Sequence, residues 1–370
     1  MNEDDRRRRK ALLDESRVRG MMLGLAIGDT VGAAVDGLPG SGPLRAGVST
    51  QLACFTAEGV IRAMVRGSHK GICHPPSVVL HAYCRWAALQ GIEVDRMRSR
   101  WAAATGDEAW PDGWLAGVPV LAERRGSAPA TVAVLTRVEG PANPEPSGSR
   151  GCHALTRSLP VAVVGTQWAR QAGEFAALTH GDPAAALAAS QAAVLVHHCL
   201  FQSPPDEGYE GSENPVRAAL AAGIAVSATL RAEGADGGSD RLLMALQHAV
   251  EQPAQSAVLA RLAPDATAPS ALLGGVYTAA SFPGRERFRD ALEFAAEAPD
   301  GDSVACVTGA LLGAVHGIEA LPVDWVSRHE LAWVLDTLAR DLLRQAELSP
   351  SGDAYNQGWD PHWWDRYPGW

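Results

Sequence analysis

Glycine recurs at every fourth position from Gly20 to Gly32 in the stretch GMMLGLAIGDTVGAAVDG, which runs to Gly37. Residues four apart are neighbours on one face of an α-helix, so this spacing leaves that face without side chains. A bare face lets another helix or a ligand approach the backbone closely. We therefore expect Gly20–Gly37 to form a helix that is buried at the centre of the fold.

Alanine-rich segments with helical spacing make up most of the remaining chain, and alternating apolar and polar runs are scarce. Prolines at the expected start and a glycine at the expected end mark Pro75–Gly91, for example. The pattern predicts an all-α fold. The helices that it predicts are Gln51–Val65, Pro75–Gly91, Asp182–Leu200, Pro215–Arg231, Asp240–Gln252, Gly284–Glu297, Ser303–Gly317 and His329–Ala346.

Connecting segments divide the helices but do not divide the chain into separate domains. Loops are predicted at Pro39–Ala46, Gly126–Arg150 and Gln202–Asn214, with a tight turn at Gly234–Ser239. None is long enough to be an interdomain linker, and no internal repeat is present. We expect a flexible N-terminal segment at 1–16, one domain over 17–348 and a Trp-rich C-terminal segment at 349–370.

Charge and composition exclude several function classes. The chain of 370 residues carries a formal net charge of −10, which disfavours non-specific nucleic-acid binding. The basic run Arg6–Lys10 follows three acidic residues and is expected to be a solvated end. We find no signal-peptide pattern and no apolar run of about 18 residues, the length that spans a membrane. The six cysteines lack a CxxC pair, so we expect reduced, mostly buried thiols in a cytoplasmic protein.

The strongest candidate for chemistry is the stretch APDGDSVACVTGALLGAVHG, which begins at Ala298. Asp300, Asp302 and Ser303 place oxygens at i, i+2 and i+3 of a helix start, where they converge on one point. Such a group suits Mg²⁺, which takes about six oxygen ligands, so this stretch supplies half of a shell. Asp29 and Asp36 are further acids. Taken alone, Asp29 is interpreted as a helix cap or an internal pair and Asp36 as a helix end, with a role at a ligand as the alternative.

Other motifs are weaker by themselves. SRGCHALTRSLP places Gly151 before a helix, which suits either an anion site or an ordinary helix start. His180 in ALTHGDP suits either a hydrogen-bonded loop histidine or a pocket wall. The pairs around His197–Cys199 and Ile72–Pro76 are interpreted as core rather than metal ligands. Phosphate-loop, nucleophile-elbow and dinucleotide-binding motifs are absent.

Taken in order, these segments resemble the ADP-ribosylglycohydrolase family, in particular the bacterial form that includes dinitrogenase reductase-activating glycohydrolases. Arg17–Asp36 is similar to the family's opening R-x-x-G-x-L-x-G-L-A-x-G-D-x-x-G-A-x-x-E, with Asp in the last place. GVSTQLACFTAEGVIRA is similar to T-D-D-T-Q-M-T-L-F-T-A-E-G-L-x-R-A, and DGDSVACVTGALLGAVHG to the closing D-x-D-[ST] helix. The resemblance covers nearly the whole chain and implies a compact all-α bundle.

The resemblance also implies a site with one half altered. The family holds two Mg²⁺ ions between D-x-D-[ST] and the T-D-D triplet, which corresponds here to Gly47, Val48 and Ser49. It implies metal ligands at Asp300, Asp302, Ser303 and Ser49. It further implies an acid–base role for Asp36 and ligand contacts from Asp29, Gly151, Cys152, His153 and His180. Val48 offers no oxygen, so we expect Mg²⁺ to bind weakly, as a single ion or not at all.

Three functions remain open from the sequence. The first is a protein shaped for ADP-ribose, a related ribosyl nucleotide or an ADP-ribosylated protein, with glycosidic hydrolysis reduced or lost. The second is an active hydrolase of an ADP-ribosyl or other N-ribosyl bond with a single or altered Mg²⁺ site. The third is a scaffold or interaction protein without a ligand. Neither nucleic acid nor a membrane is expected as a partner.

Overall fold

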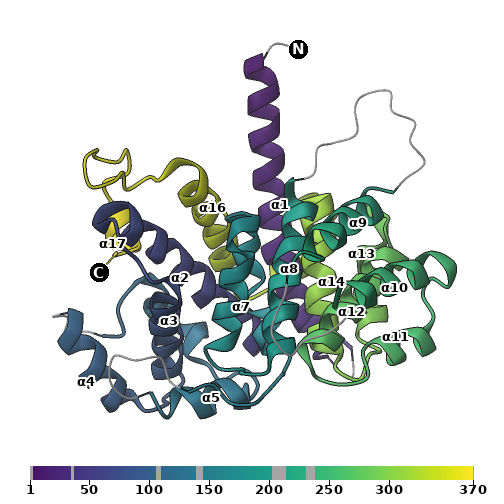
Figure 1. The fold of residues 1–370 in the computed structure, drawn as a ribbon, viewed down its shortest axis with the longest axis horizontal. Coiled ribbons are helices and arrows are strands. Elements are labelled where there is room, and N and C mark those ends of the chain that lie inside the picture. The colour runs from purple at the N-terminus through teal and green to yellow at the C-terminus, as the bar shows by residue number, and fades with distance from the viewer. Residues whose placement is uncertain are drawn as a thin grey trace.

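The structure is a computed structural model that describes residues 3–34, 37–105, 110–138, 145–201, 214–230 and 238–369. Within these ranges the regular elements are all helical, and β-type pairing is limited to isolated bridges (Figure 1). The prediction of an all-α fold is therefore confirmed. The α-helices are α1 (Glu3–Gly32), α2 (Val48–Lys70), α3 (Pro75–Leu89), α4 (Val94–Thr105), α5 (Pro129–Leu135), α6 (His153–Thr156), α7 (Ala169–Ala177), α8 (Pro183–Phe201), α9 (Pro215–Ser227), α10 (Gly238–Glu251), α11 (Ser256–Leu262), α12 (Ala268–Ser281), α13 (Phe288–Ala295), α14 (Gly301–His316), α15 (Val323–Arg328), α16 (Ala332–Leu348) and α17 (Trp363–Arg366). Short 3₁₀ helices are η1 (Trp114–Gly117), η2 (Pro119–Ala122), η3 (Leu159–Val163), η4 (Thr166–Trp168), η5 (Arg285–Arg287) and η6 (Ile318–Ala320).

The glycine face of α1 packs against α14 as an antiparallel pair with the two backbones in contact. A β-carbon on Gly24 would overlap the carbonyl of Gly309, and one on Gly28 would overlap the carbonyl of Ala305. The second half of α1 is buried, as the sequence predicted, but the helix ends at Gly32 rather than at Gly37, where the backbone is exposed and has a positive φ of 81°. Because this pairing continues to the end of α1, it brings Gly32 against Asp302 at the start of α14 and so positions the acidic cluster there.

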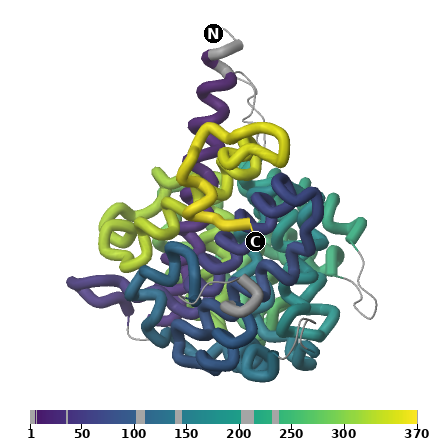
Figure 2. Tube along the Cα trace, turned by 90° about the vertical axis from the view of Figure 1, so that its left-hand side faces the viewer, coloured from purple at the N-terminus to yellow at the C-terminus, as the bar shows by residue number. Residues whose placement is uncertain are grey.

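The other helices surround this central pair (Figure 1). α2 and α16 contact α1 on one side, with α3 packed beyond α2, and α8 and α12 contact α14 on the other. The N-terminal end of α1 extends beyond the rest of the described chain in both views (Figures 1 and 2). Its exposed residues include Arg7–Lys10 of the basic run, while burial begins near Asp14.

Some helices differ from the sequence predictions. α12 lies in a stretch for which no helix was predicted. Gly274 and Gly275 lie within it, where the side chains of Val304 and Val307 approach its backbone. α5 lies inside the predicted loop at 126–150. Contrary to the sequence expectation, α8 is long and apolar enough to span a membrane, but 72% of its apolar window is buried in the protein.

The C-terminal segment is packed on the bundle. Trp363 and Tyr367 are buried, the indole of Trp363 donates to Gln345 Oε1 at 2.8 Å, and the hydroxyl of Tyr367 donates to Asp341 Oδ2 at 2.7 Å. The six cysteines are free thiols and five of them are buried, in line with the sequence expectation. The boundaries at 16 and 348 remain predictions.

Candidate functional site

The start of α14 holds the acidic cluster that the sequence singled out. The hydroxyl of Ser303 donates to the carboxylate of Asp300, and its backbone N–H donates to Asp302 Oδ1 at 2.7 Å. Ser303 is buried, whereas Asp300 and Asp302 are half-buried at the surface. Burial, together with the neighbouring charge of Asp300, raises the pKa of Asp302. The three side chains do converge, as predicted.

Asp29 reaches the same region from α1. Its carboxylate is buried and accepts hydrogen bonds from the N–H of Thr50 at 2.9 Å and from the Thr50 hydroxyl at 2.5 Å. Burial raises the pKa of Asp29 to about 6, while the Thr50 hydrogen bonds act in the opposite direction and the charge of Asp302 adds to the rise. Asp29 thus caps the start of α2 from another helix, which was one of the two interpretations left open.

The segment opposite the acidic cluster is short of oxygen ligands. Gly47 precedes α2, and a β-carbon there would lie 2.5 Å from Asp29 Oδ1. Val48 is buried and faces Gly126. The hydroxyl of Ser49 accepts a hydrogen bond from Thr156 at 3.0 Å and lies 3.2 Å from the Nδ1 of His153. The oxygens of this segment are therefore engaged within the protein.

The oxygen atoms available at this site do not fit a pair of Mg²⁺ ions. Among the described residues, no three His, Cys, Asp or Glu side chains are grouped as metal ligands require. Val48 supplies no oxygen, and the Asp29 carboxylate is bound to Thr50. About six oxygens are needed around each ion, and only the Asp300–Asp302–Ser303 cluster offers several together. The Nδ1–H of His197, one of the histidines interpreted as core, donates to the carbonyl of Ala162 at 2.9 Å.

His153 contacts the segment at the start of α2, and Cys152 contacts the acidic cluster. Burial lowers the pKa of His153 to about 4, helped by the charge of Arg157 and opposed by that of Asp300. The thiol of Cys152 hydrogen-bonds with Asp300 and Ser303, and burial followed by the charge of Asp300 raises its pKa well above the ordinary value. At neutral pH, both groups are therefore uncharged next to the acidic cluster.

The backbone of the predicted anion site is already bonded. The N–H of Gly151 donates to Ser149 Oγ at 3.1 Å, and the N–H of Cys152 donates to the carbonyl of Ala266 at 3.0 Å. These donors would have to be released before either could bind a phosphate. Any recognition of a ligand in this structure therefore depends on the side chains more than on this backbone.

His180 lies beside Gly151 and is also bonded. Its Nδ1 is 2.8 Å from the hydroxyl of Thr179, and a β-carbon on Gly151 would lie 3.5 Å from its Nε2. The buried guanidinium of Arg157 donates to Thr179 Oγ1 at 2.8 Å and to the carbonyl of Phe175 at 2.9 Å. Burial and the charge of Arg157 lower the pKa of His180 to about 2. His180 is therefore neutral and held in place.

The structure brings together marked residues from α1, α2, α6 and α14 with Gly151, Cys152 and His180 from the segments before α6 and after α7. Asp36 lies outside the described residues. Sequence reasoning missed Thr50, Thr156 and Arg157, which hold Asp29, Ser49 and the His180 loop. One signal was present for Thr50, because the residue before α2 is Gly47, which has no side chain to accept from the N–H groups of the first turn.

Comparisons with known proteins agree with this architecture. A family model described as ADP-ribosylglycohydrolase matches residues 10–351. Among solved structures, an "ADP-ribosylglycohydrolase-related protein complex" is similar with a TM-score of 0.55 and 23% sequence identity, covering 90% of this chain and 99% of that chain. At this identity the structural likeness supports the fold alone. No curated protein matches the chain.

Proposed function

Because the chain belongs to the ADP-ribosylglycohydrolase family, we propose that it binds an ADP-ribosyl group or a related ribosyl nucleotide, and that its glycosidic hydrolysis is reduced or lost. The ligand is either a small molecule or an ADP-ribosylated protein. Metal dependence is general in the family, whereas the oxygen ligands described above do not fit a pair of Mg²⁺ ions. The proposal thus combines a family ligand with an altered site.

The observation that carries the loss of hydrolysis is that Thr50 hydrogen-bonds the Asp29 carboxylate, at a site whose other segment, Gly47–Ser49, has no carboxylate. Both hydrogen bonds end on the same oxygen, Asp29 Oδ2. Gly47 and Val48 contribute no side-chain oxygen at all. A metal-bound water gains its nucleophilicity from a pKa lowered toward neutrality. Without the full set of anionic ligands, we expect that activation to be weak.

Recognition of the ribose is assigned to Asp300 and Asp302. Both carboxylates are half-buried and reach the surface, and ionised carboxylates accept hydrogen bonds from hydroxyl groups. Burial disfavours the ionised form of Asp302 and so raises its pKa. Hydrogen bonds that a ligand donates to these carboxylates would therefore stabilise the complex. The neutral imidazole of His153 offers a further hydrogen-bonding group beside them and carries no charge.

Two assays test the proposal. In calorimetry with EDTA present, we expect ADP-ribose to bind the unmodified protein, and Asp302→Ala to weaken that binding at least about tenfold. In a release assay with ADP-ribosylated arginine or serine peptides and added Mg²⁺, we expect little or no product. Turnover at a typical enzyme rate that Asp302→Ala abolishes would instead support an active hydrolase with an altered metal site.

One further outcome completes the comparison. If ADP-ribose does not bind with or without Mg²⁺, the scaffold function is favoured and the proposal is wrong. Cell fractionation is the test for the proposed cytoplasmic location. We propose no nucleic-acid or membrane partner.

A further inference from the structure

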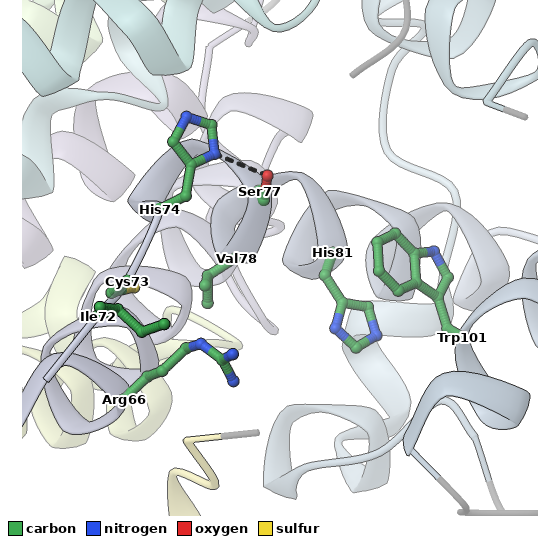
Figure 3. A pocket seen from close by; sticks show the side chains of 8 residues that line it. All are labelled: Arg66, Ile72, Cys73, His74, Ser77, Val78, His81 and Trp101. Atoms are coloured by element: carbon green, nitrogen blue, oxygen red, sulfur yellow. Dashed lines mark hydrogen bonds between the residues drawn. The ribbon is translucent and has the colours of Figure 1, made fainter. Parts of the chain in front are cut away.

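A cavity lies away from the acidic cluster, between α2, α3 and α4. Its volume is about 480 Å³, and Arg66, Ile72, Val78, His81 and Trp101 are among the residues that line it (Figure 3). We call it the α2–α4 cavity. No acidic residue is among its described lining, although the chain as a whole carries a net charge of −10. An anionic ligand would therefore meet no like charge on these walls.

His81 presents a fixed hydrogen-bond donor to this cavity. The indole N–H of Trp110 donates to His81 Nε2 at 2.9 Å, and an indole nitrogen can only donate. Nε2 must therefore be the acceptor, and the proton of the neutral ring lies on Nδ1. Burial, with the charge of Arg85 next, lowers the pKa of His81 well below its ordinary value, so the neutral ring persists.

The Nδ1–H of His81 has no partner among the described residues, although only 8% of the residue is exposed. Trp101 stacks on the ring with centroids 4.2 Å apart and planes at 15°, which fixes the ring's orientation. Nδ1 is not among the fully buried polar atoms that lack a partner, so it is accessible from the cavity. The structure therefore holds a polar group in the cavity wall that a bound acceptor would satisfy.

Arg66 supplies a positive charge in the same cavity. Figure 3 shows its guanidinium and one ring nitrogen of His81 turned toward the same space. One nitrogen of Arg66 donates to the carbonyl of Gly369 at 3.2 Å, which anchors the side chain and leaves the other donors of its planar fork. A guanidinium and a neutral N–H together favour an acceptor that carries negative charge.

We propose that the α2–α4 cavity binds a small organic anion, a carboxylate on an apolar body. The carboxylate accepts from the Arg66 guanidinium and from the His81 Nδ1–H. The apolar body lies against Val78 and Ile72, whose side chain is 75% exposed and would be covered by such a ligand. This site is separate from the acidic cluster and does not depend on the function proposed for it.

A matched pair of probes tests the charge requirement. Isothermal titration of the full chain with 1-naphthylacetate and with 1-naphthylacetamide compares an anion with a neutral molecule of nearly the same shape. We expect the acid to bind at least about tenfold more tightly than the amide. Equal affinity for both, or no binding of either, would overturn the proposal.

Substitutions locate the binding. Arg66→Met should remove the preference for the acid, whereas Arg170→Met, at an exposed surface arginine, should leave it unchanged. Unchanged acid binding by Arg66→Met contradicts the site. In the unmodified protein, the acid should also shift the ¹⁵N and ¹H signals of His81 Nδ1–H. That measurement decides the matter if the Arg66 variant fails to fold, and an unmoved His81 signal with the acid bound would refute the assignment.

Discussion

The carboxylate of Asp29 on α1 accepts two hydrogen bonds from Thr50 on α2, one from the backbone and one from the hydroxyl. Thr50 is the third residue of α2, and the residue before that helix is Gly47, so Asp29 performs from a neighbouring helix the role of an N-cap side chain. The same acid is one that the family resemblance places at the ligand. One carboxylate therefore both caps α2 and is the group proposed to contact the ligand.

The first prediction concerns pH and Asp29. Its pKa of about 6 in the folded protein exceeds the ordinary value of 3.8, so between these values the folded state binds the proton more tightly. The stability that this group contributes is present below about pH 4 and is lost as the pH rises through about 6. Relative to Asp29→Asn, the unmodified protein should lose on the order of 3 kcal/mol of unfolding free energy across that window.

Urea unfolding of both proteins at several values between pH 4 and 7 measures this difference. Using the difference removes the contributions of the other titrating groups, which the two proteins share. A difference that does not change with pH, or that changes in the opposite direction, would contradict the inferred environment of Asp29.

The second prediction concerns the contact between α1 and α14. Gly24→Ala would force a methyl group into the carbonyl of Gly309, and we expect a loss of about 2–4 kcal/mol in unfolding free energy. Gly67→Ala is the matched control, because its new methyl group would lie 3.9 Å from the β-carbon of Cys73. That change should stabilise α2 by about 0.5–1 kcal/mol. Similar effects at both positions would argue against backbone contact in the central pair.

The third prediction concerns a buried ion network between α2 and α3. Glu58 is fully buried, its Oε1 is 2.7 Å from Arg62 Nε, and it also pairs with Arg85. Glu58→Gln leaves buried guanidinium charge uncompensated and should cost about 3–5 kcal/mol in chemical denaturation. Glu174→Gln breaks a surface pair with Arg170 and should cost less than about 1 kcal/mol. Equal losses would show that burial does not govern the strength of these pairs.

The fourth prediction concerns reconstruction of the missing half-site by Gly47→Thr, Val48→Asp and Ser49→Asp together. A side chain at 47 requires the Asp29 carboxylate to move, because their atoms would otherwise be 2.5 Å apart. That movement frees Asp29, and the family resemblance places the two new carboxylates in the half-site that holds metal together with the α14 cluster. We expect Mn²⁺ affinity by calorimetry to rise at least about tenfold over the unmodified protein.

Asp302→Asn in the reconstructed background is the control for this gain. The gain should disappear, because the change removes an anionic ligand from the opposite half-site. If the triple variant binds Mn²⁺ no better than the unmodified protein, the altered triplet is not what limits metal binding. Adding His153→Gly then tests whether the imidazole, 3.2 Å from the Ser49 hydroxyl, blocks the site instead.

Local patterns in the sequence were enough to predict the all-α fold and the main helices. Examples are the four-residue glycine repeat of α1 and the start and stop residues of α3. Both signals involve residues within about one helical turn of each other, so they can be recognised without the rest of the chain. The ordered motifs likewise indicated the family and the acidic cluster at the start of α14. These features are properties of residues close together in the chain.

Tertiary structure alone decided how the site is engaged. The pairs Asp29–Thr50 and Ser49–His153 join residues 21 and 104 positions apart, and nothing local to either residue specifies its partner. The same holds for α12, where a glycine pair typical of a turn lies within a helix because the valines of α14 take up the space beside it. Which hydrogen bonds form depends on how helices distant in sequence pack, since burial removes the water that would otherwise satisfy these groups.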